Sequence, residues 1–142
     1  MLALAPAMAS AEVSVQWLGH ATTRIIDGDG RVILIDPYLS NNPKTPARYR
    51  DPETLGRVDL ILVTHGHIDH FGDLVPLART SGAPVVGPYE LLRNLVAMGV
   101  LDGKQVVSLG KGGYVEPLGR GLKVHMTQAE HSSSVDLRAP HL

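Results

Sequence analysis

The chain has 142 residues, enough for one domain with a hydrophobic core of its own. Hydrophobic residues make up 44% of it and charged residues 19%, so the composition is that of a globular protein rather than a disordered or fibrous one. A net charge of −1 and the lack of a long basic run argue against nucleic acid as a partner. There is no cysteine, so any metal must be held by nitrogen and oxygen ligands.

The first eleven residues, MLALAPAMASA, are small and apolar. They resemble the end of a secretory signal peptide with an A-x-A cleavage site, although no Lys or Arg precedes the apolar stretch. We therefore expect residues 1–11 to be a partial signal peptide and the protein to be periplasmic or secreted. The alternative is a frayed, alanine-rich terminus on a cytoplasmic protein. No segment approaches the roughly 20 apolar residues of a transmembrane helix, so no membrane partner is expected.

The next part of the chain predicts three strands. Val13, Val15 and Trp17 alternate with polar residues, as in a half-buried strand. Residues 22–26 are mostly β-branched and lead into Asp-Gly-Asp-Gly, a strong hairpin turn signal, after which 31–35 (RVILI) returns as the partner strand. Tight turns between consecutive strands predict an antiparallel meander.

The middle of the chain predicts a loop, a buried strand and two helices. Residues 41–52 are polar and contain prolines, which favours a surface loop. Residues 58–63 (VDLILV) form a nearly continuous apolar run, as expected of a strand that is buried on both faces. Asp73 is placed to cap a helix from about Leu74 to Thr80, and a second helix is predicted over 89–98.

Further short strands are predicted between glycine-rich turns, at residues 84–86, 105–109, 114–118 and 122–127. His125 alternates with apolar neighbours and is expected on the exposed face of its strand. Strands that alternate with helices after an opening meander indicate an α/β sheet.

The clearest chemical signal is His65-x-His67-x-Asp69-His70, directly after the buried strand and before a helix. Any one of these residues has an ordinary explanation, such as a surface histidine or, for Asp69, a helix cap. Four candidate ligands within six residues of an irregular loop can instead direct alternate side chains to two adjacent points. Imidazole suits zinc, copper, iron and nickel, and carboxylate extends the range to manganese. The four residues together predict a metal site.

The run THGHIDHFGD resembles the T-H-x-H-x-D-H signature of the metallo-β-lactamase superfamily. The segments WLGHATTRI, VILIDPYLS and AEHSSS are similar to one branch of it, the metal-dependent hydrolases related to ascorbate-6-phosphate lactonase. This resemblance covers about Val13 to Ser134. It implies an α/β (α+β) fold, an αββα sandwich of two similar halves, of which residues 12–142 would be the N-terminal portion.

The resemblance also implies a role for each ligand. His65, His67 and His131 would hold the first of two divalent metal ions, and Asp69 and His70 would belong to the second. Asp69 would also act catalytically by orienting the attacking water. Zinc is the expected metal, with manganese as the alternative.

Two residues outside this set also match the branch. Asp36 corresponds to an aspartate that supports the metal loop by hydrogen bonding. His20, in WLGHA, lies in a loop near the active site of the resembling branch, so we expect it to be a catalytic residue that faces substrate or metal. The alternative for His20 is an ordinary hairpin-turn histidine.

The implied function is hydrolysis of a lactone, ester or phosphodiester in a small molecule, by a water that the two metals activate. The second half of the family's fold normally supplies a bridging aspartate and a final histidine, and the chain is expected to end before both. A non-catalytic metal-binding or assembly module is therefore the alternative function. An uncovered apolar face would also favour self-association, or a second half that supplies the missing ligands.

Overall fold

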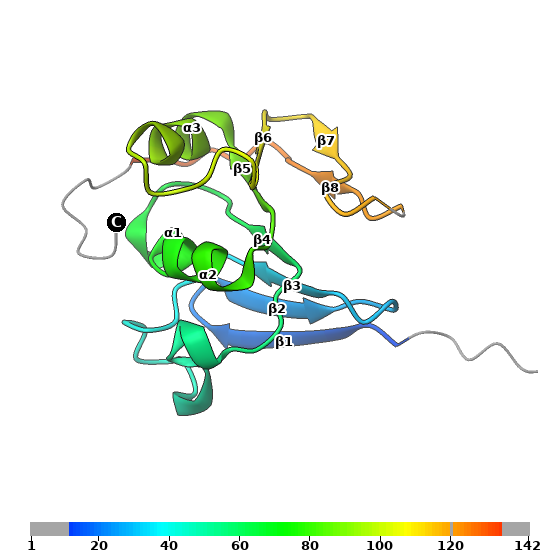
Figure 1. Ribbon diagram of the computed structural model, residues 1–142, viewed down its shortest axis with the longest axis vertical. Coiled ribbons are helices and arrows are strands. Elements are labelled where there is room, and N and C mark those ends of the chain that lie inside the picture. Colours follow the sequence, from blue (N-terminus) through cyan, green and yellow to red (C-terminus); the bar gives the residue numbers. More distant parts are fainter. Residues whose placement is uncertain (1–11, 120, 135–142) are drawn as a thin grey trace, which may run out of the picture.

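The computed structural model describes residues 12–119 and 121–134. The partial signal peptide predicted at residues 1–11 lies outside the described residues. Within them the chain forms a six-stranded sheet in the order β1-β2-β3-β4-β5-β6 and a separate two-stranded ribbon, β7-β8 (Figure 1). The predicted α/β class is confirmed.

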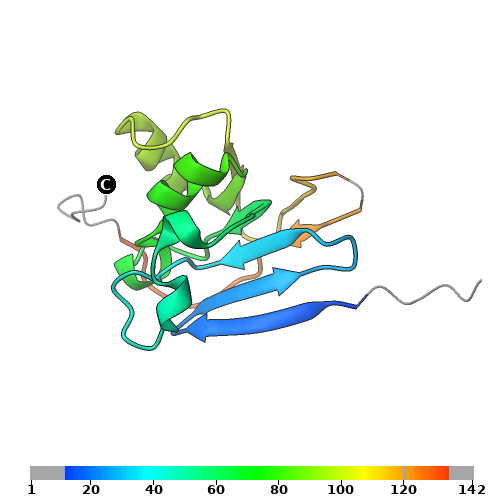
Figure 2. The ribbon, with the colours of Figure 1, turned by 60° about the horizontal axis from the view of Figure 1, so that its bottom comes forward.

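The first three strands are the predicted meander. β1 (Ser14–Gly19), β2 (Thr22–Ile26) and β3 (Val32–Ile35) pair antiparallel and lie along one side of the molecule (Figure 2). The turn between β2 and β3 is closed by Asp27, whose carboxylate accepts hydrogen bonds from the backbone N–H groups of Asp29 and Arg31. Local turn chemistry therefore fixes the register of the β2–β3 hairpin.

The other three strands of the large sheet are parallel. β4 (Leu60–Leu62) pairs with β3 and β5 (Val85–Pro88), and β6 (Val106–Leu109) lies beside β5. Leu60 and Ile61 are both 0% exposed, which confirms the doubly buried strand that the apolar run predicted. Because these strands are parallel, the segments that leave their carboxyl ends meet at one edge of the sheet. The histidine-rich loop leaves β4 at that edge.

The described residues form three α-helices: α1 (Ile68–Phe71) and α2 (Leu74–Ser81) lie between β4 and β5 in the chain, and α3 (Tyr89–Ala97) lies between β5 and β6. Side chains from α2 and α3 join side chains of the sheet in one core, which includes Leu34, Ile61, Leu74, Leu77, Leu92 and Leu95. The short helix α1 was not predicted, and it places Asp69 and His70 on a helical turn rather than in an irregular loop. None of the helices within the described ranges has the length and hydropathy needed to cross a membrane.

Asp73 occupies the N-cap position before α2, as predicted, but the capping role expected of its side chain is wrong. The Asp73 side chain makes no cap hydrogen bond. It is 2% exposed and accepts hydrogen bonds from the backbone N–H groups of Leu39 and Ser40 and from the Ser40 hydroxyl (Oγ–Oδ1 2.6 Å). Three donors from the loop after β3 occupy the carboxylate, so Asp73 anchors that loop to the start of α2.

The apolar side chains of β1 are less buried than their alternation suggested. Val15 and Trp17 are each 66% exposed. Val15 pairs with Ile25 and therefore shares its face of the sheet. Further along that face, β7 (Tyr114–Val115) and β8 (Val124–His125) cover the sheet and form a second core cluster with it. Part of this face is thus apolar and exposed among the described residues, and self-association through it stays a prediction.

Candidate metal centre

The motif residues are presented by the chain between β4 and α2. Thr64 to His67 cross from the strand to the helix, and His67 occupies the N-cap position of α1 with an extended backbone (φ −77°, ψ 141°). Asp69 and His70 then lie in the first turn of α1. An extended segment followed by a helical turn projects the side chains in two directions. The motif therefore contributes to two neighbouring clusters.

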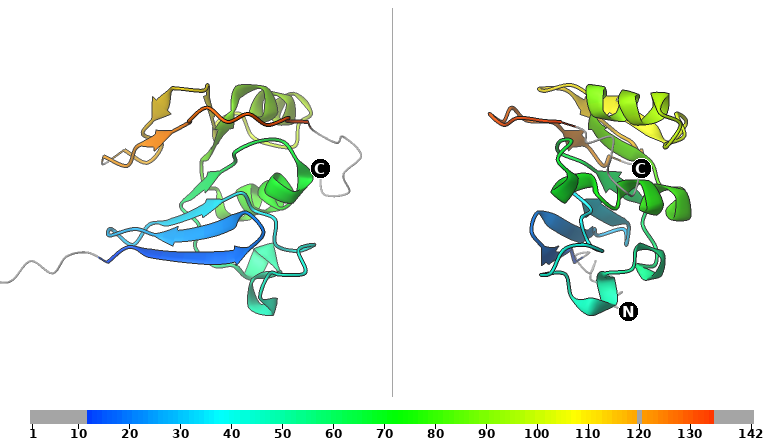
Figure 3. Two further views of the ribbon diagram at one scale, coloured as in Figure 1. Left: turned by 180° about the vertical axis from the view of Figure 1, so that it is seen from behind. Right: turned by 90° about the vertical axis from the view of Figure 1, so that its left-hand side faces the viewer.

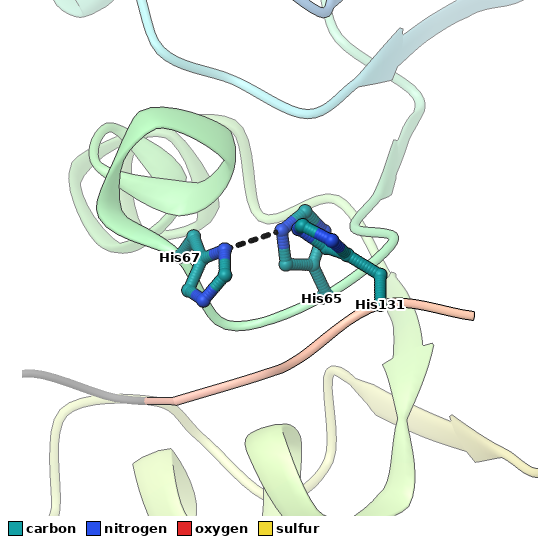
Figure 4. Close-up of side chains that lie close together, drawn as sticks. All are labelled: His65, His67 and His131. Carbon is teal, nitrogen blue, oxygen red and sulfur yellow. Dashed lines mark hydrogen bonds between the residues drawn. The ribbon is translucent and has the colours of Figure 1, made fainter. Parts of the chain in front are cut away.

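His65, His67 and His131 form the first cluster, which we call the first triad. One nitrogen from each ring lies within 4.8 Å of the others. His65 Nε2 is 2.9 Å from His67 Nδ1, and the His131 ring lies 4.7 Å from that of His65, centroid to centroid (Figure 4). His131 comes from the last described segment, which passes between α3 and the loop after β4 (Figure 3).

His20, Asp69 and His70 form the second cluster, the second triad, whose ligand atoms also lie within 4.8 Å of one another. His20 Nε2 is 2.9 Å from Asp69 Oδ2, and the His20 and His70 ring centroids are 5.1 Å apart. The two triads adjoin, because the His65 and His70 centroids are only 4.1 Å apart. The structure thus brings together every candidate site residue that the sequence suggested.

Asp36 holds both the start of the metal loop, at Thr64, and the second triad, at His70, by hydrogen bonds. It is 3% exposed, and its Oδ1 accepts a hydrogen bond from the Thr64 backbone N–H (2.7 Å). Its Oδ2 accepts from the Thr64 hydroxyl (2.8 Å) and lies 2.9 Å from His70 Nδ1. A proton held on Nδ1 by this carboxylate leaves the Nε2 lone pair of His70 available to a metal. These contacts are the ones that the supporting role implied for Asp36 requires.

Backbone strain is concentrated at this centre. Among the described residues, His20 (φ +50°) and Asp36 (φ +49°) are the two non-glycine residues with a positive φ. The left-handed conformation costs an L-residue about 1–2 kcal/mol, less for Asp, whose short polar side chain tolerates it. Such conformations persist where the surrounding structure holds them, and they cluster at functional sites. His20 belongs to the second triad, and Asp36 contacts it through His70.

The turn that carries His20 depends on Gly19. Gly19 has φ +107°, and a Cβ there would lie 2.9 Å from the Asn42 side chain, 3.0 Å from the Lys44 carbonyl carbon and 3.1 Å from the Thr45 nitrogen. We predict that Gly19→Ala lowers the free energy of unfolding by about 1–3 kcal/mol, measured by urea denaturation. Gly30→Ala is the control, because Gly30 also has a positive φ (+76°) but has nothing within 4 Å. If both variants lost the same free energy of unfolding, crowding around position 19 would not be the cause.

Thr64 and Ser133 also build the site, and the sequence interpretation gave neither a role. Thr64 belongs to the motif itself, so its position was a usable signal. Ser133 Oγ accepts a hydrogen bond from the Gly66 backbone N–H (3.0 Å), and a Cβ on Gly66 would lie 2.6 Å from the Ser134 carbonyl oxygen. This close approach holds the segment that bears His131 against the loop. No local pattern marks Ser133, because its partner lies 67 residues away.

The electrostatic surroundings favour a neutral His65. Burial lowers the pKa of its imidazole below the ordinary 6.5, and the nearby His70, His67 and His131 lower it further, while Asp36 acts in the opposite direction. A neutral imidazole is the form that binds metal. Protons therefore compete less well with a metal at His65 than at an isolated histidine.

The chemistry of the two donor sets fits divalent metal ions. Three imidazoles form one of the common protein sites for zinc, with a fourth position left for water. Two imidazoles and a carboxylate also bind zinc, and the carboxylate makes manganese acceptable. Each triad has its ligand atoms within 4.8 Å of one another. With metal–nitrogen distances of about 2.0–2.1 Å, ligand atoms at this spacing can reach one ion after small side-chain movements.

A cavity of about 760 Å³ opens beside the first triad. Its lining includes His65, His131, Tyr89, Leu109, Lys111 and Met126. Small-molecule sites usually measure about 300–1,000 Å³ and are mostly apolar with a few polar groups. The cavity therefore has the size and character of a small-molecule site next to candidate metal ligands.

Comparison with known proteins adds independent information. A family model described as "Beta-lactamase superfamily domain" matches residues 31–141. A UPF0173 metal-dependent hydrolase from Cupriavidus taiwanensis is 50% identical over 133 residues, which cover 93% of this chain and 46% of the relative. Another from Cupriavidus necator is 45% identical and covers 91% of this chain and 45% of the relative. The chain spans about half the length of the curated relatives it matches.

A solved structure is similar as well. Igni18, a metallo hydrolase from the hyperthermophilic archaeon Ignicoccus hospitalis, superposes with a TM-score of 0.72 at 30% sequence identity. The match covers 85% of this chain and 50% of Igni18. The sheet and the helices described above are therefore those of a known metallohydrolase fold.

Proposed function

The chain belongs to the β-lactamase superfamily, and from that premise we propose that the protein is a metal-dependent hydrolase that directs an activated water at a lactone, ester or phosphodiester of a small molecule. The match to the family model confirms the superfamily resemblance that the T-H-x-H-x-D-H run indicated. One observation carries the proposal: two triads of metal-binding side chains adjoin at a distance of 4.1 Å between the His65 and His70 rings. The relatives, which are named metal-dependent hydrolases, support the reaction class.

We propose two divalent ions as cofactors, zinc in the first instance, with manganese as the alternative. The all-imidazole first triad favours zinc, while Asp69 in the second triad makes manganese acceptable as well. Ions bound there would lower the pKa of a water and polarise the carbonyl or phosphoryl group of the substrate.

The residues of the chain hold this arrangement ready. Asp36 fixes the ring of His70 and the start of the loop at Thr64, so little reorganisation is needed when substrate binds. The Asp69 carboxylate can accept a hydrogen bond from a water molecule, and this orients the lone pair of that water. Asp36 thus positions the His70 ring and Asp69 orients the water. The proposed hydrolysis needs no serine or cysteine nucleophile.

The cavity beside the first triad supports a small molecule as the substrate. Its volume of about 760 Å³ suits such a ligand. Lys111 and Glu90 carry opposite charges in its lining, so the lining lacks the strongly basic character with which proteins bind the phosphate backbone of nucleic acids.

The test is a substrate screen with the full-length protein loaded with Zn²⁺ or Mn²⁺. We expect turnover of at least one class among esters, lactones and phosphodiesters, its loss on chelation, and its return when metal is added back. Asp69→Asn should lower kcat while His125→Ala leaves it unchanged, because His125 is exposed and stacks on Tyr114 (ring centroids 5.1 Å apart). Two bound metals without turnover in any class would refute the hydrolase and support a non-catalytic metal-binding module.

A further inference from the structure

Burial does not account for the position of Trp17, the one tryptophan in the sequence. Trp17 is 66% exposed, as is Val15 two residues earlier on the same face of β1. A tryptophan in contact with solvent gains only part of the free energy that its large ring could contribute to a core. Its polar group is engaged instead, because the indole Nε1–H donates to the carbonyl oxygen of His20 (2.8 Å). This hydrogen bond is the clearest role of the side chain.

The indole closes the turn that carries His20. Trp17 is fixed in β1 by its pairing with Thr23 on β2, and the register of the two strands shifts between Trp17 and Gly19. Leu18, between them, is 0% exposed and anchors the end of the strand in the core. His20 follows with φ +50°, a conformation that an L-residue rarely adopts. The hydrogen bond from the indole ties the His20 peptide group to the strand and so holds the turn in this conformation.

The orientation of His20 matters because its side chain belongs to the second triad. His20 Nε2 lies 2.9 Å from Asp69 Oδ2, and both side chains are 45% exposed. An ion pair as exposed as this adds little, because water and salt screen it and two side chains must be ordered. The pair alone is therefore a weak restraint on the imidazole. A backbone that is held from the strand keeps the ring within reach of Asp69 and His70.

We propose that Trp17 is a positioning residue: its indole N–H holds the backbone of His20 so that the imidazole stays at the second triad. The inference rests on the proposed function, because it takes this triad to be a metal site. Trp17 acts through His20 and not on substrate. The first triad should not depend on Trp17, because its three histidines come from other segments of the chain.

The test is calorimetric titration of Zn²⁺ into the full-length wild type, Trp17→Phe and Val15→Ala. Phenylalanine keeps an apolar ring on the strand and suits a strand, so the variant should fold without the N–H donor. We expect second-site affinity to fall by about 2- to 10-fold in Trp17→Phe, the factor that one net hydrogen bond is worth, and first-site affinity to stay unchanged. The binding step that Asp36→Asn weakens identifies the second site. Val15→Ala is the matched control, because Val15 is equally exposed (66%) but lies outside the turn.

A double-mutant cycle with His20→Gly separates positioning from a purely structural role. Glycine removes the imidazole and accepts a positive φ. If Trp17 acts through His20, Trp17→Phe should cause no further loss of second-site affinity in the His20→Gly background. In the metal-free protein, ¹⁵N relaxation of the His20 amide should show greater mobility in Trp17→Phe than in the wild type.

Unchanged second-site affinity in Trp17→Phe, or an equal fall in the His20→Gly background, would overturn the inference and leave the proposed function standing. An equal fall in Val15→Ala would also overturn it, since the cause would then be the exposed face of β1 rather than the indole N–H. A wild type that binds no zinc would refute the proposed function. The mobility of His20 in the metal-free protein would still decide whether Trp17 holds the turn.

Discussion

Replacing Asp36 with asparagine is expected to lower the affinity of the second triad for metal by about 10- to 100-fold while the fold stays intact. Asparagine tolerates the positive φ at this position (+49°). Its amide oxygen can still accept from the Thr64 backbone N–H, but its amide nitrogen must then face His70 Nδ1. An N–H group there forces His70 to offer the Nδ1 lone pair, so the ring proton moves to Nε2. The nitrogen that should bind metal then carries a proton.

Two measurements check this expectation. Calorimetric titration with Zn²⁺ should show weakened binding at one site only, and ¹⁵N chemical shifts of the imidazoles should show the changed tautomer of His70 in the metal-free protein. Asp73→Asn is the matched control, because Asp73 is equally buried (2% exposed against 3%) and also anchors a loop, yet touches no candidate ligand. An unchanged His70 tautomer in Asp36→Asn would contradict the mechanism.

His67→Ala should remove metal from the first triad, lowering its affinity by at least about 100-fold, because even outer partners of ligands cost 10- to 100-fold. The metal-free protein should tolerate the change. His67 stands at the N-cap of α1 but makes no side-chain cap hydrogen bond, so its removal takes no support from the helix. The loss is therefore one of binding rather than of folding.

Thermal unfolding with and without zinc measures this loss. A ligand at 100 times its dissociation constant stabilises the folded state by about 2.7 kcal/mol, and His67→Ala should lack this gain at the zinc concentration that stabilises the wild type. His125→Ala serves as the control, since its exposed imidazole lies outside both triads. A variant that zinc stabilises as much as the wild type would show that His67 is not a ligand.

These predictions separate the two triads. The Asp36 variant acts on the second triad, and the His67 variant acts on the first. The rings of His65 and His70 lie 4.1 Å apart, so some coupling between the sites is expected. Titrations of single and double variants would measure it directly.

Most of the secondary-structure elements and the metal loop could be predicted from local signals in the sequence, although the short helix α1 could not. The Asp27 turn and the β-branched runs around it define the β2–β3 hairpin within a dozen residues. The apolar run at 58–63 has no polar side to expose apart from Asp59, so it had to be a buried strand. Four ligand residues in one short motif likewise need no tertiary information to be recognised.

How distant segments of the chain complete the site becomes visible only in the three-dimensional structure. His20 and His131 reach the loop from opposite ends of the described chain, and Ser133 is fixed by a partner 67 residues away. Asp73 looked like a local cap, but donors from the loop after β3 occupy it. The positive φ of His20 could not be read from residue type, because histidine is enriched in that region but most histidines still have a negative φ. Local patterns specify which elements form, whereas the order of strands in the sheet determines which side chains meet.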